Sequence, residues 1–217
     1  SFRDKLFAFN HKNNKLASRF TGISNFIFSN TFTSNIVKNI SGVHSKRRLP
    51  LVNKSSFEAL LKRKSSVASP IKTVYLFVDE FSEYLDGNIA IDALDLLTKL
   101  NYQVKLITHF ESGRALISKG FLDEAKEVAN KNISIFSNVI SSETPLIGIE
   151  PSAILTFRDE YKRLANDKGK AESIAKNTFL IEEFLALEIK DRNIKPEQFS
   201  SETKTIIIHN HCHQKAI

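Results

Sequence analysis

The stretch TVYLFVD, residues 73–79, decides the fold of this chain. It is a short apolar run of β-branched and aromatic residues, which is typical of a strand that is buried on both faces of a sheet. Three later runs have the same character: YQVKLIT at 102–108, TPLIGIE at 144–150 and KTIIIH at 204–209. We therefore predict four strands, the first of which begins at about Thr73.

Helical patterns separate these runs. Apolar residues recur at helical spacing in four segments, at 88–101, 121–141, 151–165 and 171–190. Asn101 is a suitable stop for the first, and Pro151 suits the first position of the third, where a missing N–H costs nothing. The inner face of the last segment is expected to carry Phe179, Ile181, Phe184 and Leu185. Strands that alternate with helices form βαβ units, so the sequence predicts an α/β fold with a parallel, Rossmann-like sheet and flanking helices.

The first third of the chain differs from the rest in composition and charge. It is rich in Asn, Ser, Lys and Phe, and its periodicity is weak. Residues 1–73 hold 14 Lys and Arg against two acidic residues, whereas the remainder holds 17 against 22. We predict a basic, mostly helical and irregular connector over 1–72, in which Ser55 or Ser56 caps a helix, and an α/β domain over 73–217. The connector's candidate docking residues are Phe20, Phe26, Phe28 and Phe32.

The overall composition, 41% hydrophobic and 25% charged, is ordinary for a soluble globular protein. No apolar run approaches the ~18–20 residues that span a bilayer, and a single cysteine excludes an intrachain disulfide. We therefore expect a cytoplasmic location. A basic connector can bind nucleic acid, an anionic membrane or an acidic neighbouring domain. Because its aromatic residues are not regularly interleaved with the basic ones, we predict no nucleic-acid partner.

Polar side chains follow each predicted strand, where ligands of parallel sheets gather. The four segments are VDEF, HFESGR, EPS and HNHCHQ. They carry Asp79, Glu80, His109, Glu111, Ser112, Arg114, Glu150, Ser152, His209, His211, Cys212 and His213. We predict that the loops at His109–Arg114, Glu150–Ser152 and His209–His213 lie side by side. The acid pairs Asp159/Glu160 and Glu182/Glu183 are interpreted as solvated helix faces.

Residues 209–213 place three histidines and the only cysteine within five positions. His and Cys are natural zinc ligands, and several cysteine thiolates hold an iron–sulfur cluster. In an extended segment, His209, His211 and His213 would point to one side, and Asn210 and Cys212 to the other. Three interpretations stay open: a zinc site that also uses His109, a Cys–His nucleophile without an evident oxyanion hole, and histidines that bond loop backbone beside a buried thiol. No glycine-rich phosphate loop is present.

Four ordered motifs resemble the cysteine-rich (Cys-Cys-Gly) domain of iron–sulfur oxidoreductases. They are ESGRALISKGFLDEAKEVANKN, PLIGIEPSAILTFRDEY, NTFLIEEFLA and HNHCHQKA. The family includes the iron–sulfur subunit of glycolate oxidase and fusion proteins of the D-lactate and D-2-hydroxyglutarate dehydrogenase type. The segment GVHSKRRLP resembles the connector that precedes this domain. The resemblance covers about residues 40–217 and implies that the chain is a fragment, truncated at its C-terminal end.

The chain departs from the family at its ligand positions. The first Cys-Cys-Gly falls on Glu111, Ser112 and Gly113, and the cysteine of Pro-Ser-Cys falls on Ala153. Only Cys212 remains, and in the family a second Cys-Cys-Gly follows HCHQKA. The resemblance implies a cofactor-binding set of Glu111, Ser112, Gly113, Arg114, Glu150, Ser152, His211, Cys212 and His213. Its metal ligands would be His209, His211, Cys212 and His213, and we expect no cluster in the chain as it stands, because one thiolate is too few.

The resemblance implies an enzyme that oxidises a D-2-hydroxy acid at FAD, of the glycolate, D-lactate or 2-hydroxyglutarate class. Electrons would then pass through 4Fe-4S iron–sulfur clusters to a quinone or another carrier. The implied partners are an FAD-linked oxidase domain and a ferredoxin-like iron–sulfur domain, with peripheral association at the inner face of the membrane. We expect the chain alone to be inactive and to contain no catalytic residue. The alternatives are a degenerate, non-redox scaffold and a zinc-binding module.

Overall fold

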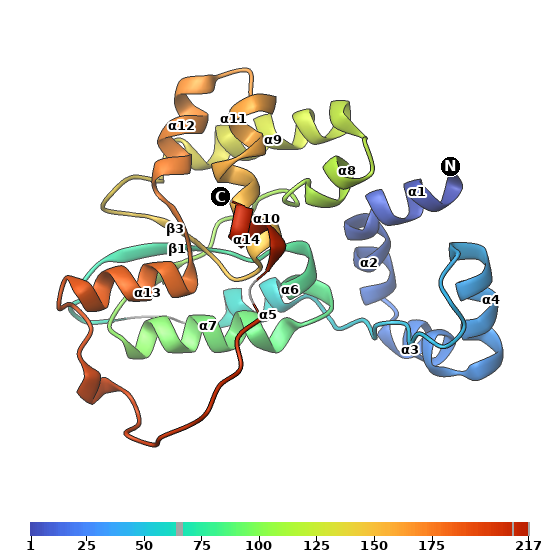
Figure 1. Cartoon of the computed structure of the whole chain (residues 1–217), viewed down its shortest axis with the longest axis horizontal. Helices are drawn as coiled ribbons and strands as arrows, with labels where there is room; N and C mark the ends of the chain where they lie inside the picture. The colour runs from blue at the N-terminus through green and yellow to red at the C-terminus, as the bar shows by residue number, and fades with distance from the viewer. Residues whose placement is uncertain (64–66, 210, 217) are drawn as a thin grey trace.

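The computed structural model describes residues 1–63, 67–209 and 211–216. Its described residues form one parallel sheet in the order β2-β1-β3-β4 (Figure 1). The strands are β1 (Thr73–Phe77), β2 (Gln103–Lys105), β3 (Leu146–Gly148) and β4 (Thr178–Leu180). The register sets Val74 beside Val104, and Ile147 beside both Leu76 and Phe179. The prediction of a parallel α/β fold is therefore confirmed.

The predicted fourth strand is wrong. Residues 204–209 form no strand, and Ile206, Ile207 and Ile208 are 75%, 95% and 79% exposed. The fourth strand, β4, lies instead inside the predicted helix at 171–190, which divides into α12 (Lys168–Lys176), β4 and α13 (Ile181–Lys190). A strand requires a partner for its backbone N–H and C=O groups. The edge of β3 provides that partner for β4, whereas the isoleucine run has none in the described part of the chain.

Helices cover both faces of the sheet (Figure 1). Alternate strand residues point to opposite faces, so Phe77 and Leu146 belong to one buried cluster, and Leu76 and Ile147 belong to the other. The first cluster is covered by α9 (Leu122–Phe136), α10 (Pro151–Arg158), α11 (Glu160–Leu164) and α12. The second is covered by α7 (Gly87–Lys99) and α13. The predicted inner face of the 171–190 segment, Phe179, Ile181, Phe184 and Leu185, packs in this second cluster.

One predicted helix, at 151–165, is broken in two. Pro151 occupies the first position of α10, as predicted, and the Glu150 side chain caps it by accepting a hydrogen bond from the Ala153 N–H at 2.6 Å. At Asp159 the backbone leaves helical geometry, with φ −113° and ψ −81°. The break starts α11 in a new direction. It therefore determines where the Asp159 and Glu160 side chains point.

The connector is mostly helical, as predicted. Its helices are α1 (Phe2–Ala8), α2 (Asn10–Ser18), α3 (Thr21–Ser29), α4 (Thr31–Ser41) and α5 (Ser56–Lys62). Ser55 caps α5 by accepting a hydrogen bond from the Glu58 N–H. Two of these helices enter the α/β core: Ala8 packs with Leu116 and Ala125, and Leu60 packs in the cluster beneath α7.

Three phenylalanine side chains of the connector are more than half exposed: Phe20 in the turn before α3, Phe26 in α3 and Phe32 in α4. They are available for docking, which stays a prediction.

Among the described residues, none of the helices combines the length and apolar character needed to cross a lipid bilayer.

Candidate functional site

The first strand is followed by structural acids rather than by an open site. Asp79 caps α6 (Glu80–Tyr84): its Oδ1 accepts from the Phe81 and Ser82 N–H groups, and its Oδ2 accepts from the Ser82 hydroxyl at 2.6 Å. Burial raises the pKa of Asp79 despite these hydrogen bonds. The adjacent Glu80 is fully buried, and burial together with the Asp79 charge raises its pKa to about 7. Both carboxyl groups face the protein interior.

The loop at 111–113 is held by a buried hydrogen-bond network. Ser112 donates to Glu80 twice, from its N–H at 3.0 Å and from its hydroxyl at 2.7 Å. The Tyr161 hydroxyl donates to the Ser112 carbonyl at 3.0 Å, and the Asn132 side chain donates to the Glu111 carbonyl at 2.9 Å. The hydroxyl of Ser112 is thus committed to Glu80. It is not free to bind a cofactor.

Glu111 and Gly113 contribute to this loop in different ways. Burial raises the pKa of Glu111 to about 7, and its Oε2 is sealed from solvent with no hydrogen-bond partner among the described residues. Gly113 has φ +76°, a left-handed conformation that glycine tolerates, and it precedes α8 (Arg114–Ser118). The loop therefore turns sharply at Gly113 and brings Arg114 to the start of a helix.

His109 does not join the other predicted ligands. Its ring stacks on Phe77 with centroids 4.3 Å apart, and its Nδ1 lies 2.7 Å from the Phe110 carbonyl. Burial lowers the pKa of His109 to about 4, so the ring is neutral at neutral pH. It lines a pocket of about 260 Å³ with His11, Arg19 and other residues of the connector side. His209 is exposed, and Asn210 lies outside the described residues.

Parts of the three predicted loops do meet in one pocket of about 400 Å³. Its lining consists of Arg114, Ser152, Asp159, Glu160, His211, Cys212 and His213. Arg114 begins α8, Ser152 lies in the first turn of α10, and the last three residues lie at the start of α14 (Cys212–Ala216), which contacts α10 (Figure 1). Glu150 is directed away to its cap, where it also accepts from the Ser152 hydroxyl at 2.7 Å.

The HCH segment is partly helical rather than extended. α14 begins at Cys212, and the His213 N–H donates to the Nδ1 of His211 at 3.2 Å. The alternation that an extended segment would give, with the three histidines on one side, therefore does not apply. The helical turn carries the His213 ring to the carboxylates of the α10–α11 break, and leaves Cys212 exposed.

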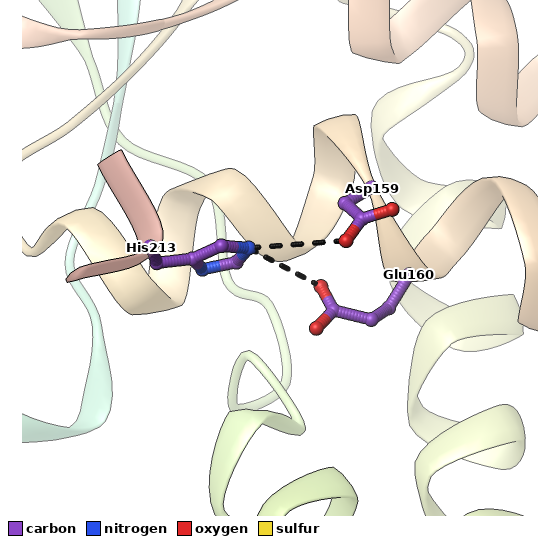
Figure 2. A group of neighbouring side chains, drawn as sticks. All are labelled: Asp159, Glu160 and His213. Carbon is purple, nitrogen blue, oxygen red and sulfur yellow. Dashed lines mark ion pairs between the residues drawn. The ribbon is translucent and has the colours of Figure 1, made fainter. Parts of the chain in front are cut away.

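Asp159, Glu160 and His213, which line this pocket, point toward one another, as Figure 2 shows. The Nε2 of His213 lies 4.0 Å from the Asp159 Oδ2 and 3.9 Å from the Glu160 Oε2. The side chains of His213 and Glu160 are only 13% and 15% exposed. The interpretation of Asp159/Glu160 as a solvated helix face is wrong for Glu160, because the break at Asp159 turns this pair toward α14.

This donor set fits a single metal ion better than an iron–sulfur cluster. A cluster requires several thiolates, but Cys212 is the only cysteine of the chain. Ala153 is fully buried and offers no donor atom, and Ser112 is bonded to Glu80. An imidazole and two carboxylates are instead ligands that zinc accepts. In the described part of the chain, this is the one group of three His, Cys, Asp or Glu residues with ligand atoms within 4.8 Å of one another.

The chain is similar in sequence to bacterial D-2-hydroxyglutarate dehydrogenases. It is 30% identical to that of Escherichia coli over 110 residues, which are 50% of this chain and 11% of the relative. It is 28% identical to that of Haemophilus influenzae over the same length, again 50% of this chain and 11% of the relative. The Pseudomonas putida protein aligns over 206 residues at 21% identity, 89% of this chain and 19% of the relative.

The chain thus spans between about a tenth and a fifth of the length of these relatives. No family model matches the sequence, and no solved structure matches it. The similarity supports a relationship to oxidoreductases of D-2-hydroxy acids. It does not by itself support the assignment of the chain to a cysteine-rich domain.

Proposed function

We propose that this chain is part of an oxidoreductase that acts on a D-2-hydroxy acid of the glycolate, D-lactate or 2-hydroxyglutarate class. The similarity to several D-2-hydroxyglutarate dehydrogenases supports the reaction class. The observation that carries the proposal is the convergence of motifs that lie far apart in the sequence. Arg114, Ser152 and Cys212, one from each of three motifs of the family resemblance, line one pocket.

Within such an enzyme, FAD would accept the hydride equivalent from the substrate, in a domain that the resemblance places before this chain. We assign no flavin contact and no catalytic residue to the present chain. An iron–sulfur cluster does not fit its described residues, because Ser112 and Ala153 replace thiolates and are both buried. The role that its residues support best is that of a non-redox scaffold, which positions the flavin-bearing and ferredoxin-like parts relative to each other.

The connector offers surfaces for these partners. It carries a net charge of +12, whereas the rest of the chain carries −5, and its exposed aromatic side chains Phe20, Phe26 and Phe32 lie on the neighbouring helices α3 and α4 and the turn before them. Exposed apolar groups of this kind mark interaction sites. We propose an acidic, partly apolar surface of the same enzyme as the partner, with an anionic membrane or a quinone-linked carrier as further contacts of the complex.

The experiment is a turnover assay on the native polypeptide that carries this sequence. We expect it to reduce an artificial dye with D-2-hydroxyglutarate, D-lactate or glycolate, to reject L-2-hydroxyglutarate and L-lactate, and to show a flavin spectrum. A flavin-loaded protein that reduces no dye with any of the three acids would refute the reaction class.

The Cys212→Ser variant distinguishes two roles for this chain, that of a non-redox scaffold and that of an electron carrier. If the exposed thiol of Cys212 is a cluster ligand completed by cysteines from elsewhere in the enzyme, the variant loses iron and acceptor turnover, while flavin reduction by substrate stays intact. A scaffold retains iron content and acceptor turnover. Buried Ser112→Ala is a poor control because it disturbs the fold, so Ser118→Ala on the exposed end of α8 is the matched comparison.

A further inference from the structure

We propose that Asp159, Glu160 and His213 bind one divalent transition-metal ion, with zinc as the first candidate. This site goes beyond the proposed reaction and does not depend on it. Its ligands come from two places that are distant in sequence, the α10–α11 break and α14 (Figure 2). A bound ion would therefore fasten the C-terminal helix to the body of the domain.

Each carboxylate keeps one oxygen free for the ion. Asp159 accepts a hydrogen bond from Arg163 on Oδ1, and Glu160 accepts one from Arg114 on Oε1. The other two oxygens, Asp159 Oδ2 and Glu160 Oε2, face the Nε2 of His213. The arginines thus fix the two carboxylates, as second-shell partners do at metal sites.

Two buried polar atoms of this group, one of which faces the candidate ion position, lack hydrogen-bond partners among the described residues. Glu160 Oε2 is sealed from solvent and accepts no hydrogen bond among the described residues, and the same holds for the Nδ1 of His213. Leaving a buried polar atom unpaired costs free energy. At 3.9 and 4.0 Å, the contacts of His213 Nε2 with the carboxylates are too long for hydrogen bonds. A cation bound at Nε2 would satisfy the Glu160 oxygen, whereas Nδ1 lies on the other side of the ring and would still need its own partner.

The distances suit coordination by one ion after a small adjustment. Two ligands of a tetrahedral zinc ion, each ~2.1 Å from it, lie about 3.4 Å apart. The three ligand atoms here lie within 4.8 Å of one another, so displacements of up to about 0.7 Å per atom would close the site. The fourth position would be taken by water from the pocket; Cys212 lines the same pocket but is not within ligand distance of the three side chains.

The ligand types determine which metal is expected. One imidazole nitrogen with two carboxylate oxygens favours zinc, cobalt or another transition metal over magnesium and calcium, which prefer all-oxygen sites. The positive charges of Arg114 and Arg163 offset the negative charges of the two carboxylates, which weakens their attraction for a cation. We therefore expect moderate affinity. The competing arrangement is a protonated His213 that pairs with both carboxylates and binds no metal.

The test uses Co²⁺ as a spectroscopic probe and Zn²⁺ in calorimetric titration of the 217-residue chain. We expect one equivalent of each ion to bind, with visible Co²⁺ bands of a low-coordinate site, and no comparable binding of Mg²⁺. His213→Gln should weaken binding by more than about 100-fold, beyond the loss typical of a second-shell change. His209→Gln is the matched control, because His209 is exposed and outside the pocket, and it should bind as the parent does.

Zn²⁺ should also protect the amides of α14 from hydrogen exchange in the parent but not in His213→Gln. Because His213 lies in a short helix at the surface of the domain, circular dichroism of this variant should match that of the parent. The proposal is overturned if neither ion binds stoichiometrically, if His213→Gln binds as tightly as the parent, or if His209→Gln loses binding to the same degree. The first of these outcomes would assign the three side chains to an ion pair.

Discussion

Gly148 lies where the sheet and α10 approach most closely, and a single methyl group there should damage the fold. A Cβ at this position would lie 2.3 Å from the Cβ of Ile154, 2.4 Å from its Cγ1 and 2.8 Å from its Cδ1. Ordinary contacts between carbon atoms are ~3.5–4.0 Å. Because the nearest atom is attached directly to the α10 backbone, a change of rotamer at Ile154 cannot relieve the clash. Either α10 or β3 must move by more than an ångström.

The cost of Gly148→Ala can be worked from this geometry. Overpacking a core typically costs 1–3 kcal/mol, and the fixed position of the Ile154 Cβ places this substitution at the upper end, about 3 kcal/mol. For a chain of this size, that corresponds to a decrease in Tm of roughly 6–12 °C. The Ile154→Ala background keeps the 2.3 Å contact, so it should relieve only part of the loss.

Urea denaturation followed by circular dichroism measures the change in the free energy of unfolding. Gly22→Ala is the matched control, because no atom lies within 4 Å of its added methyl group and its site is an exposed helix, where alanine should stabilise by up to about 1 kcal/mol. A Gly148→Ala protein within about 0.5 kcal/mol of the parent would refute the reasoning. Since α10 carries Ser152 and leads to Asp159, its displacement should also weaken Co²⁺ binding.

Two further predictions concern buried polar groups. Burial lowers the pKa of His109 to about 4, so the unfolded chain binds more protons at this group between pH 6.5 and 4. The contribution of His109 to the free energy of unfolding should therefore fall by up to roughly 3 kcal/mol as the pH drops through that window. Glu80, with its pKa raised to about 7, acts oppositely and lowers stability as the pH rises from 4.5 through 7. His109→Phe should flatten the acid limb of urea midpoints measured against pH, and an unchanged limb would contradict the assignment. Ser112→Ala removes the 2.7 Å hydrogen bond to Glu80 and should cost about 1–3 kcal/mol, whereas Ser118→Ala should change the urea midpoint little.

The sheet was predictable where a strand is buried on both faces, as in β1 and β3. Such a run is short, mostly apolar, and rich in β-branched or aromatic residues, which favours a buried strand over a helix. β4 could not be found in the same way, because its three residues continue the helical spacing of 171–190. β4 forms because its backbone pairs with the edge of β3, and this pairing depends on the tertiary structure. The isoleucine run at 206–208 shows the converse, since strong strand propensity without a pairing edge leaves all three side chains exposed.

The site was predictable as a meeting of loops but not as a set of ligands. Parallel topology places Arg114 and Ser152 near one another, because they follow β2 and β3. His213 reaches the same pocket by another route, since no strand directly precedes it among the described residues and α14 instead packs on α10. Asp159 and Glu160 were missed because a continuous helix over 151–165 would point them into solvent. The break at Asp159 is a backbone feature, with ψ −81°, and no Gly or Pro marks it in the sequence. Only the packing of α10 against the sheet shows where the helix must end.

The positions at which the resembled family carries cysteines have a different physical role in this chain. Ser112 supplies two of the hydrogen bonds that keep the buried Glu80 carboxyl satisfied, and Ala153 is fully buried in the apolar cluster between α10 and the sheet. Restoring cysteines at 112 and 153 would leave Glu80 short of a strong donor and would overpack α10 against the sheet, so the cluster cannot be recovered by those substitutions alone. The open, partly polar part of the domain is the pocket at His213. The 111–113 loop therefore takes part in no candidate metal site among the described residues, and the proposed metal ligands lie at the α10–α11 break and on α14 instead.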